Sequence, residues 1–131
     1  MRKAVLALAA LAAALVVPAV GAAGGTVNVT LKEFTVKPVP ASITAGKVTF
    51  KVKNAGKLGH ELVVLKTTTA PGKLKVKGAR AVETGKVGEV AELKPGKSGT
   101  LTKTFARGKY VLLCNVPGHY QAKQYVGFVV K

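Results

Sequence analysis

Residues 110–124 read YVLLCNVPGHYQAKQ, and the rest of the chain is organised around this stretch. It begins as an apolar β-type segment, passes through a tight loop at Pro117 and Gly118, and ends where another segment starts. It holds the only cysteine of the chain, Cys114, and one of its two histidines, His119. A thiolate and an imidazole with four residues between them on such a loop can bind one small metal ion together.

The second histidine, His60, stands 54 positions before Cys114. If the fold brings His60 beside Cys114, the chain has a trigonal set of two imidazoles and one thiolate. A soft sulfur with imidazole nitrogens suits copper, zinc or iron, and His₂Cys with a weak axial partner suits a blue-copper site. Structural zinc normally takes four strong ligands, and this chain has three such residues, so the donor set favours copper. The alternatives are a buried Cys114 that acts as a small hydrophobic residue and a His60 that is an ordinary surface histidine.

The loop from Cys114 to His119, the upstream Gly59-His60 pair and the lead-in at residues 108–113 resemble the cupredoxins, the blue copper proteins. The loop is similar to that of bacterial members of the plastocyanin/azurin group. The resemblance covers roughly the whole chain after the N-terminal leader. It implies that His60, Cys114 and His119 are the three strong ligands of one copper ion per chain.

The fourth ligand departs from the usual family pattern. Cupredoxins usually have an axial methionine next to a glycine, whereas this chain has Lys123 and Gln124 there and only one methionine, Met1. Gln124 resembles the axial glutamine of the stellacyanins, although these carry a disulfide that a one-cysteine chain cannot form. The resemblance implies Gln124 as the axial ligand, with a backbone carbonyl such as that of Gly59 as the alternative. The asparagine that follows the first histidine in plastocyanin and azurin is Glu61 here.

The first 23 residues have the pattern of a secretory signal peptide. Arg2 and Lys3 form a basic start, an uncharged apolar stretch follows, and small residues end it. Cleavage there leaves residues 24–131 as one copper-binding domain of about 108 residues. The alternative is an uncleaved membrane anchor, because residues 4–23 carry no charge and are long enough to span. Either reading predicts an exported protein in the periplasm, the cell envelope or the extracellular space.

The charge balance is strongly basic, with 21 basic and 5 acidic side chains and a net charge of +16. Removal of Arg2 and Lys3 with the leader leaves 19 basic and 5 acidic side chains, a net charge of +14 with neutral histidines. Such a charge favours acidic redox partner proteins, or an anionic membrane or cell-wall surface. Export and the even spread of the lysines argue against nucleic acid, and we expect a monomer. Lysines alternate with apolar residues, as on the solvent face of strands, at positions 47, 51 and 53 and again at 73, 75 and 77.

The pattern after the leader is β throughout and predicts an all-β fold, a Greek-key β-sandwich of seven to eight short strands. The clearest of the predicted strands are residues 27–36, 48–52, 61–66, 100–105, 108–114 and 124–130, and residues 67–90 are broken by proline and glycine. Gln124 has the same parity as the apolar positions of the last strand, so it should point inward. Lys103 also has an inward parity, and we expect its side chain to extend to solvent from the edge of the sandwich.

These observations predict a one-electron carrier of the type 1 (blue) copper class. Ligands from two distant strand ends and one loop, backed by a packed sandwich, keep their geometry when the metal changes oxidation state. Copper oxidases and nitrite reductases with this kind of fold need further histidines for a second copper centre, so we expect no enzyme activity. An apolar patch around His119, formed by Val116, Pro117, Gly118, Tyr120 and Leu58, should let electrons pass. The alternative is a copper-binding or delivery protein without redox turnover.

Overall fold

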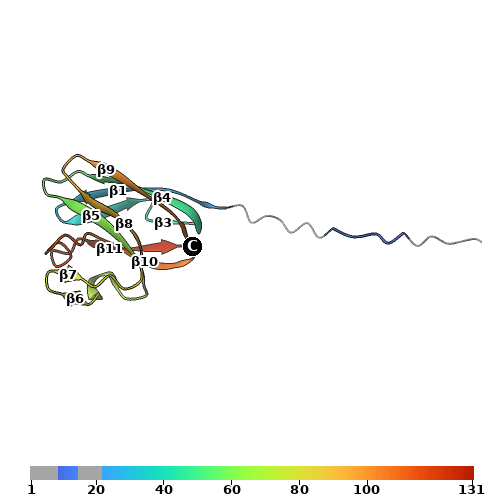
Figure 1. Cartoon of the computed structure of the whole chain (residues 1–131). Helices are drawn as coiled ribbons and strands as arrows, with labels where there is room; N and C mark the ends of the chain where they lie inside the picture. The colour runs from blue at the N-terminus through green and yellow to red at the C-terminus, as the bar shows by residue number, and fades with distance from the viewer. Residues whose placement is uncertain (1–8, 15–21) are drawn as a thin grey trace, which may run out of the picture.

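The computed structural model describes residues 9–14 and 22–131, and two β-sheets lie face to face in it (Figure 1). One sheet has the strand order β2-β1-β4-β9, with bounds β1 (Gly24–Lys32), β2 (Thr35–Val39), β4 (Gly46–Asn54) and β9 (Ser98–Phe105). The other has the order β3-β11-β10-β5-β8, with bounds β3 (Ser42–Ile43), β5 (His60–Lys66), β8 (Lys86–Leu93), β10 (Gly108–Leu113) and β11 (Tyr125–Val130). A 3-10 turn, η1 (Pro71–Lys73), and a small hairpin of β6 (Val76–Lys77) and β7 (Arg80–Ala81) complete the described elements.

Both sheets are mixed, and the predicted all-β sandwich is confirmed. β1 pairs with β4 in parallel, β11 pairs with β3 in parallel, and the other pairs within the two sheets are antiparallel. The sequence pattern did not separate the short strands β2 and β3 from their neighbours, because each is too short or too polar to show its own alternation.

The core lies between the sheets and follows the alternation in the sequence. Val27, Val29 and Leu31 of β1 are fully buried, and the Phe50 ring packs edge-on against Phe105 with 5.3 Å between ring centroids. A second apolar cluster lies on the opposite face of the five-stranded sheet and contains Val63, Leu65, Ala81, Val111, Leu113 and Tyr120. β5 and β10 are therefore buried on both faces, which fixes the strand ends that carry His60 and Cys114.

Two strand predictions were wrong. The strand predicted to continue from residue 27 to Val36 reverses at Glu33 and Phe34, and Lys32 pairs with Thr35 across the resulting hairpin. The lysines at 73, 75 and 77 do not lie on a sandwich strand, because η1 and the two-residue β6 occupy this region and Val76 is 47% exposed. Alternation alone misled in both places, because it carries no information about where the chain turns.

The prediction for Lys103 is confirmed. Its side chain is exposed, and Nζ donates a hydrogen bond to the carbonyl oxygen of Val87 over 2.8 Å at the edge strand β8. The predicted signal peptide, in contrast, falls largely on residues 1–8 and 15–21, which lie outside the described residues. In the part of the chain that the structure describes, no helix is long and apolar enough to cross a membrane.

Candidate metal centre

Strand pairing brings the sequence-predicted site residues to one end of the sandwich. β5 and β10 are antiparallel neighbours with Val63 opposite Leu113, so His60 at the start of β5 lies beside Cys114 just after β10. β11 pairs with the other edge of β10, and the backbone N–H of Cys114 donates to the carbonyl oxygen of Gln124 over 3.0 Å. The loop between these strands, residues 114–124, carries His119 and is called the ligand loop below.

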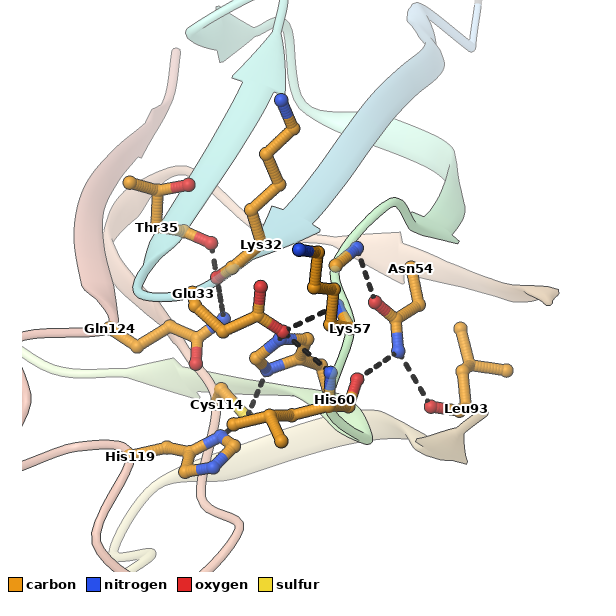
Figure 2. Close-up of polar contacts among 12 residues, drawn as sticks. Lys32, Glu33, Thr35, Asn54, Lys57, His60, Leu93, Cys114, His119 and Gln124 are labelled. Carbon is orange, nitrogen blue, oxygen red and sulfur yellow. Dashed lines mark hydrogen bonds and ion pairs between the residues drawn. The ribbon is translucent and has the colours of Figure 1, made fainter. Parts of the chain in front are cut away.

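His60, Cys114 and His119 form one group whose possible ligand atoms all lie within 4.8 Å of one another. The Cys114 Sγ atom is 3.8 Å from His60 Nδ1 and 3.4 Å from His119 Nδ1 (Figure 2). A sulfur and a nitrogen bound at about 2.3 and 2.05 Å to one metal, with an angle of about 120°, would be about 3.8 Å apart. The three side chains are therefore placed to hold a single metal ion.

The side-chain oxygen of Gln124 is buried beside the three strong ligands without a hydrogen-bond partner in the described part of the chain. Its side chain is fully buried, and its Nε2 donates to the carbonyl oxygens of Lys32 and Thr35 over 2.8 and 3.2 Å. Among the described residues, its Oε1 is the one buried side-chain nitrogen or oxygen without a hydrogen-bond partner. Figure 2 shows this oxygen pointing toward the side where Cys114 and His119 lie. A buried acceptor without a donor is uncommon, and a metal ion at the adjacent group would be its partner.

Burial favours the neutral forms of Cys114 and His119. Burial raises the pKa of the Cys114 thiol, although the backbone N–H of Glu61, 3.4 Å from Sγ, acts in the opposite direction. A bound cation deprotonates a coordinating thiol outright. Burial and the neighbouring His60 lower the pKa of His119 and outweigh the nearby Gln124 side chain, which acts in the opposite direction. The lowered pKa favours the neutral imidazole, which has a nitrogen lone pair for a metal.

The sequence interpretation missed the groups that hold the three residues from outside. Glu33 Oε1 accepts hydrogen bonds from His60 Nε2 over 3.0 Å and from the backbone N–H groups of Lys57 and Leu58 over 2.7 Å each. These hydrogen bonds lower the pKa of Glu33 to about 2, and the bond from the Leu58 N–H has the largest effect. The sequence does contain a signal for Glu33, because it is one of only five acidic residues and stands at a possible turn between two β-patterned segments.

Two buried asparagines fasten the loops on either side of the site. Asn54 donates to the carbonyl oxygens of Leu58 and Leu93 over 2.8 Å each, which ties the loop before His60 to β8 (Figure 2). Asn115 exchanges hydrogen bonds with the N–H and C=O of Ala81 over 2.8 and 2.9 Å, and it also donates to Glu83. Asn115 directly follows Cys114, which could have drawn attention to it, but neither asparagine has a spacing in the sequence that identifies its partner.

A buried cysteine sulfur between two imidazoles, at the end of a β-sandwich and beside an amide oxygen, defines a protein with a single mononuclear copper site. Residues 4–126 match the family described as the cupredoxin-like domain, and the chain belongs to this family. The resemblance inferred from the Cys114–His119 loop is thus confirmed. Both histidines of the chain lie in this one group, which leaves none for the second copper centre of a copper enzyme.

Solved structures agree with this family at the level of the fold. The chain is 22% identical to a reduced auracyanin from the photosynthetic bacterium Roseiflexus castenholzii, with 82% of this chain and 96% of that chain covered and a TM-score of 0.59. Auracyanin B is 21% identical over 82% and 88% of the two chains, with a TM-score of 0.62. Rusticyanin from Thiobacillus ferrooxidans is 18% identical over 81% and 77%, also with a TM-score of 0.62. No protein with a curated description matches the chain.

Proposed function

We propose that the chain is an exported type 1 (blue) copper protein that carries one electron at a time between redox partners. The observation that supports this function best is the buried His60–Cys114–His119 group with the unpartnered Gln124 oxygen beside it. When copper is bound, it supplies a one-electron Cu(II)/Cu(I) couple. The protein residues hold the donor atoms in one arrangement, since each lies next to a doubly buried strand or in the fastened ligand loop.

Access for electrons is best at His119. Its side chain is 8% exposed whereas His60 is fully buried, and Pro117 and Gly118 beside it lie at the surface. Phe34 and Leu58, 39% and 48% exposed, add apolar surface at this end of the sandwich. Tyr120 does not belong to this patch, because it is buried and its hydroxyl donates to the Pro71 carbonyl oxygen.

The partners and the location are part of the same proposal. A mature net charge of +14 favours acidic redox proteins over basic ones, and it would also hold the protein near an anionic membrane or cell wall. The leader at residues 1–23, cleaved or kept as an anchor, would place residues 24–131 in the periplasm, the cell envelope or the extracellular space. Gln124 is the proposed axial ligand.

Titration of the purified exported protein with Cu(II) tests the copper class. One equivalent should give a thiolate-to-Cu(II) absorption near about 600 nm, and Cys114→Ser should abolish it. His60→Ala and His119→Ala should weaken copper binding and alter the spectrum. Thr104 is exposed at the end of β9 that is remote from the site, so Thr104→Ala should leave both the binding and the spectrum unchanged. A colourless Cu(II) complex of the wild type would contradict the proposal.

Electron self-exchange separates the carrier from a copper-binding or delivery protein. A carrier exchanges electrons quickly between its Cu(I) and Cu(II) forms because its ligands move little. Slow exchange in a protein that is nevertheless blue would favour the delivery function, which the rigid and largely buried site does not support.

A further inference from the structure

The short turn between β1 and β2, residues 32–35, contacts three of the four side chains at the copper site. Glu33 accepts the His60 hydrogen bond, and the ring of Phe34 lies edge-on to His119 with 5.1 Å between centroids. The carbonyl oxygens of Lys32 and Thr35 accept from Gln124, as Figure 2 shows. The turn is far from the ligand loop in sequence and carries no strong copper ligand.

We propose that this β1–β2 turn is a positioning element of the copper site. In this role, Glu33 selects the His60 tautomer whose Nδ1 lone pair faces the metal. The carbonyl oxygens of Lys32 and Thr35 orient the Gln124 amide so that its oxygen faces the metal. The proposal rests on the copper site and does not depend on whether the protein carries electrons.

The argument for Glu33 starts from the chemistry of a neutral imidazole, which has one N–H and one lone pair. An ionised carboxylate can only accept, so the 3.0 Å contact with Glu33 places the His60 proton on Nε2. The lone pair then lies on Nδ1, the nitrogen that faces Cys114 Sγ. Carboxylates that accept the distal N–H of a metal-bound histidine fix the ring in this way and raise its basicity.

Glu33 is itself held in place before any metal binds. The oxygen that accepts from His60 also accepts the backbone N–H groups of Lys57 and Leu58, which lie just before His60 in the chain. A Cβ atom on Gly56 would collide with the Glu33 carboxylate and would displace it from these hydrogen-bond partners. One carboxylate thus joins the turn, the loop at residues 56–58 and the imidazole.

The argument for Gln124 is one of hydrogen-bond capacity. Lys32 and Thr35 each present a carbonyl oxygen, which can only accept, so the NH₂ end of the amide must lie between them. The amide oxygen is then left on the side of the site, which explains why it has no partner among the described residues. In the reversed orientation the amide oxygen would face two other acceptors and the NH₂ group, which cannot donate a lone pair to copper, would face the metal.

The first test uses the metal-free exported protein at about pH 8, above the ordinary titration range of histidine. Long-range ¹H–¹⁵N NMR spectra of the wild type should show His60 protonated at Nε2. Glu33→Gln should keep this tautomer because its amide oxygen still accepts, whereas Glu33→Ala should give a mixture. Gly56→Ala, which displaces the Glu33 carboxylate, should resemble Glu33→Ala. Glu92→Gln is the matched control, since it removes an exposed carboxylate near the site that makes no bond to a ligand.

Copper affinity gives the second readout. Glu33→Ala and Gly56→Ala should bind Cu(II) about 10- to 100-fold more weakly, whereas Glu33→Gln and Glu92→Gln should stay within about threefold of the wild type. A wild-type His60 protonated at Nδ1 would overturn the proposal whether or not the variants fold. Equal Cu(II) affinity in Glu33→Ala and Glu92→Gln would overturn it as well.

Hydrogen exchange of side-chain amides tests the second half of the proposal. The Gln124 NH₂ protons should exchange much more slowly than those of Gln121, an exposed glutamine of the same loop that donates to Gly78 over 3.2 Å. In the metal-free protein, Gln124→Glu should unfold at a lower urea concentration than the wild type, because a carboxylate would face the two turn carbonyls in place of the NH₂ group. Exchange as fast as that of Gln121 would show that the turn does not hold the amide.

Discussion

Replacement of Gln124 by methionine tests the axial ligand most directly. The Gln124 oxygen is buried, unpartnered and directed at the copper site, so it is the best candidate for the axial ligand. An amide oxygen is a harder donor than a thioether sulfur and therefore stabilises Cu(II) relative to Cu(I). Gln124→Met should accordingly raise the midpoint potential of the bound copper.

The size of the rise follows from the strength of the contact that is lost. If the amide oxygen stabilises Cu(II) over Cu(I) by as much as a hydrogen bond to a charged group, about 1.5–3 kcal/mol, the rise is about 65–130 mV at about 59 mV per tenfold. The variant also loses the two hydrogen bonds to Lys32 and Thr35, so the metal-free protein should lose about 1–3 kcal/mol of unfolding free energy.

The assay compares midpoint potentials of the wild type, Gln124→Met and Lys123→Gly in one buffer. Lys123 is the control because it is adjacent but exposed, and an ammonium about 10 Å away in water changes the potential by only about 20 mV. Its φ of 70° lies in the left-handed region that favours glycine, so Lys123→Gly should leave the backbone path intact. A potential that stays the same or falls in Gln124→Met would refute Gln124 as the axial ligand.

Three further predictions concern charge, the ligand loop and acid stability. Stopped-flow reduction by an acidic redox protein should slow as ionic strength rises, since salt screens the +14 charge, and a rate insensitive to salt would argue against steering by the lysines. Asn115→Ala should lower the unfolding free energy by about 2–3 kcal/mol in urea titrations, because the buried N–H and C=O of Ala81 lose their partner; an unchanged midpoint would count against this account. In the metal-free protein the pKa of Glu33 is lowered from 4.5 to about 2, so the stability it contributes is present above about pH 4.5 and is lost as the pH falls toward 2. Thermal unfolding of Glu33→Gln should depend less on pH in this window than that of the wild type.

The three strong ligands could be predicted because the information that places them is local or periodic. Cys114 and His119 share one loop, and His60 directly precedes an apolar run that reads as a buried strand. The inward direction of Gln124 followed from its parity with Phe128 and Val130, and the side chain is indeed fully buried.

The role of Glu33 could not be predicted in the same way. It lies 27 positions from His60 and reaches it only because the chain reverses at residues 33 and 34, where the alternating pattern indicated an uninterrupted strand. Periodicity shows which face a residue takes within a strand, but it does not show where a strand ends. Because the turn could not be predicted from the pattern, its hydrogen bonds to the site could not be predicted either.

The segment at residues 67–90 was the least legible in sequence, yet it is what fastens the ligand loop. A chain with one cysteine cannot close this loop with a disulfide, so other contacts must restrict it. The N–H of Gly118 donates to Ala79, the Tyr120 hydroxyl bridges Pro71 and Leu74, and Asn115 pairs with Ala81.

These bonds explain why the segment resists interpretation from its own pattern. Residues 86–90 belong to β8 and pair with β5, but between residues 71 and 83 several backbone groups pair instead with side chains and loop atoms of residues 114–121. This part of the segment therefore needs neither alternation nor helical periodicity. An irregular segment that satisfies the polar groups of another irregular segment can restrict a metal loop, and the Asn115–Ala81 pair does so with both hydrogen bonds buried. The rigidity that the proposed one-electron function requires thus comes, on this side of the copper site, from residues whose sequence carries no motif for it.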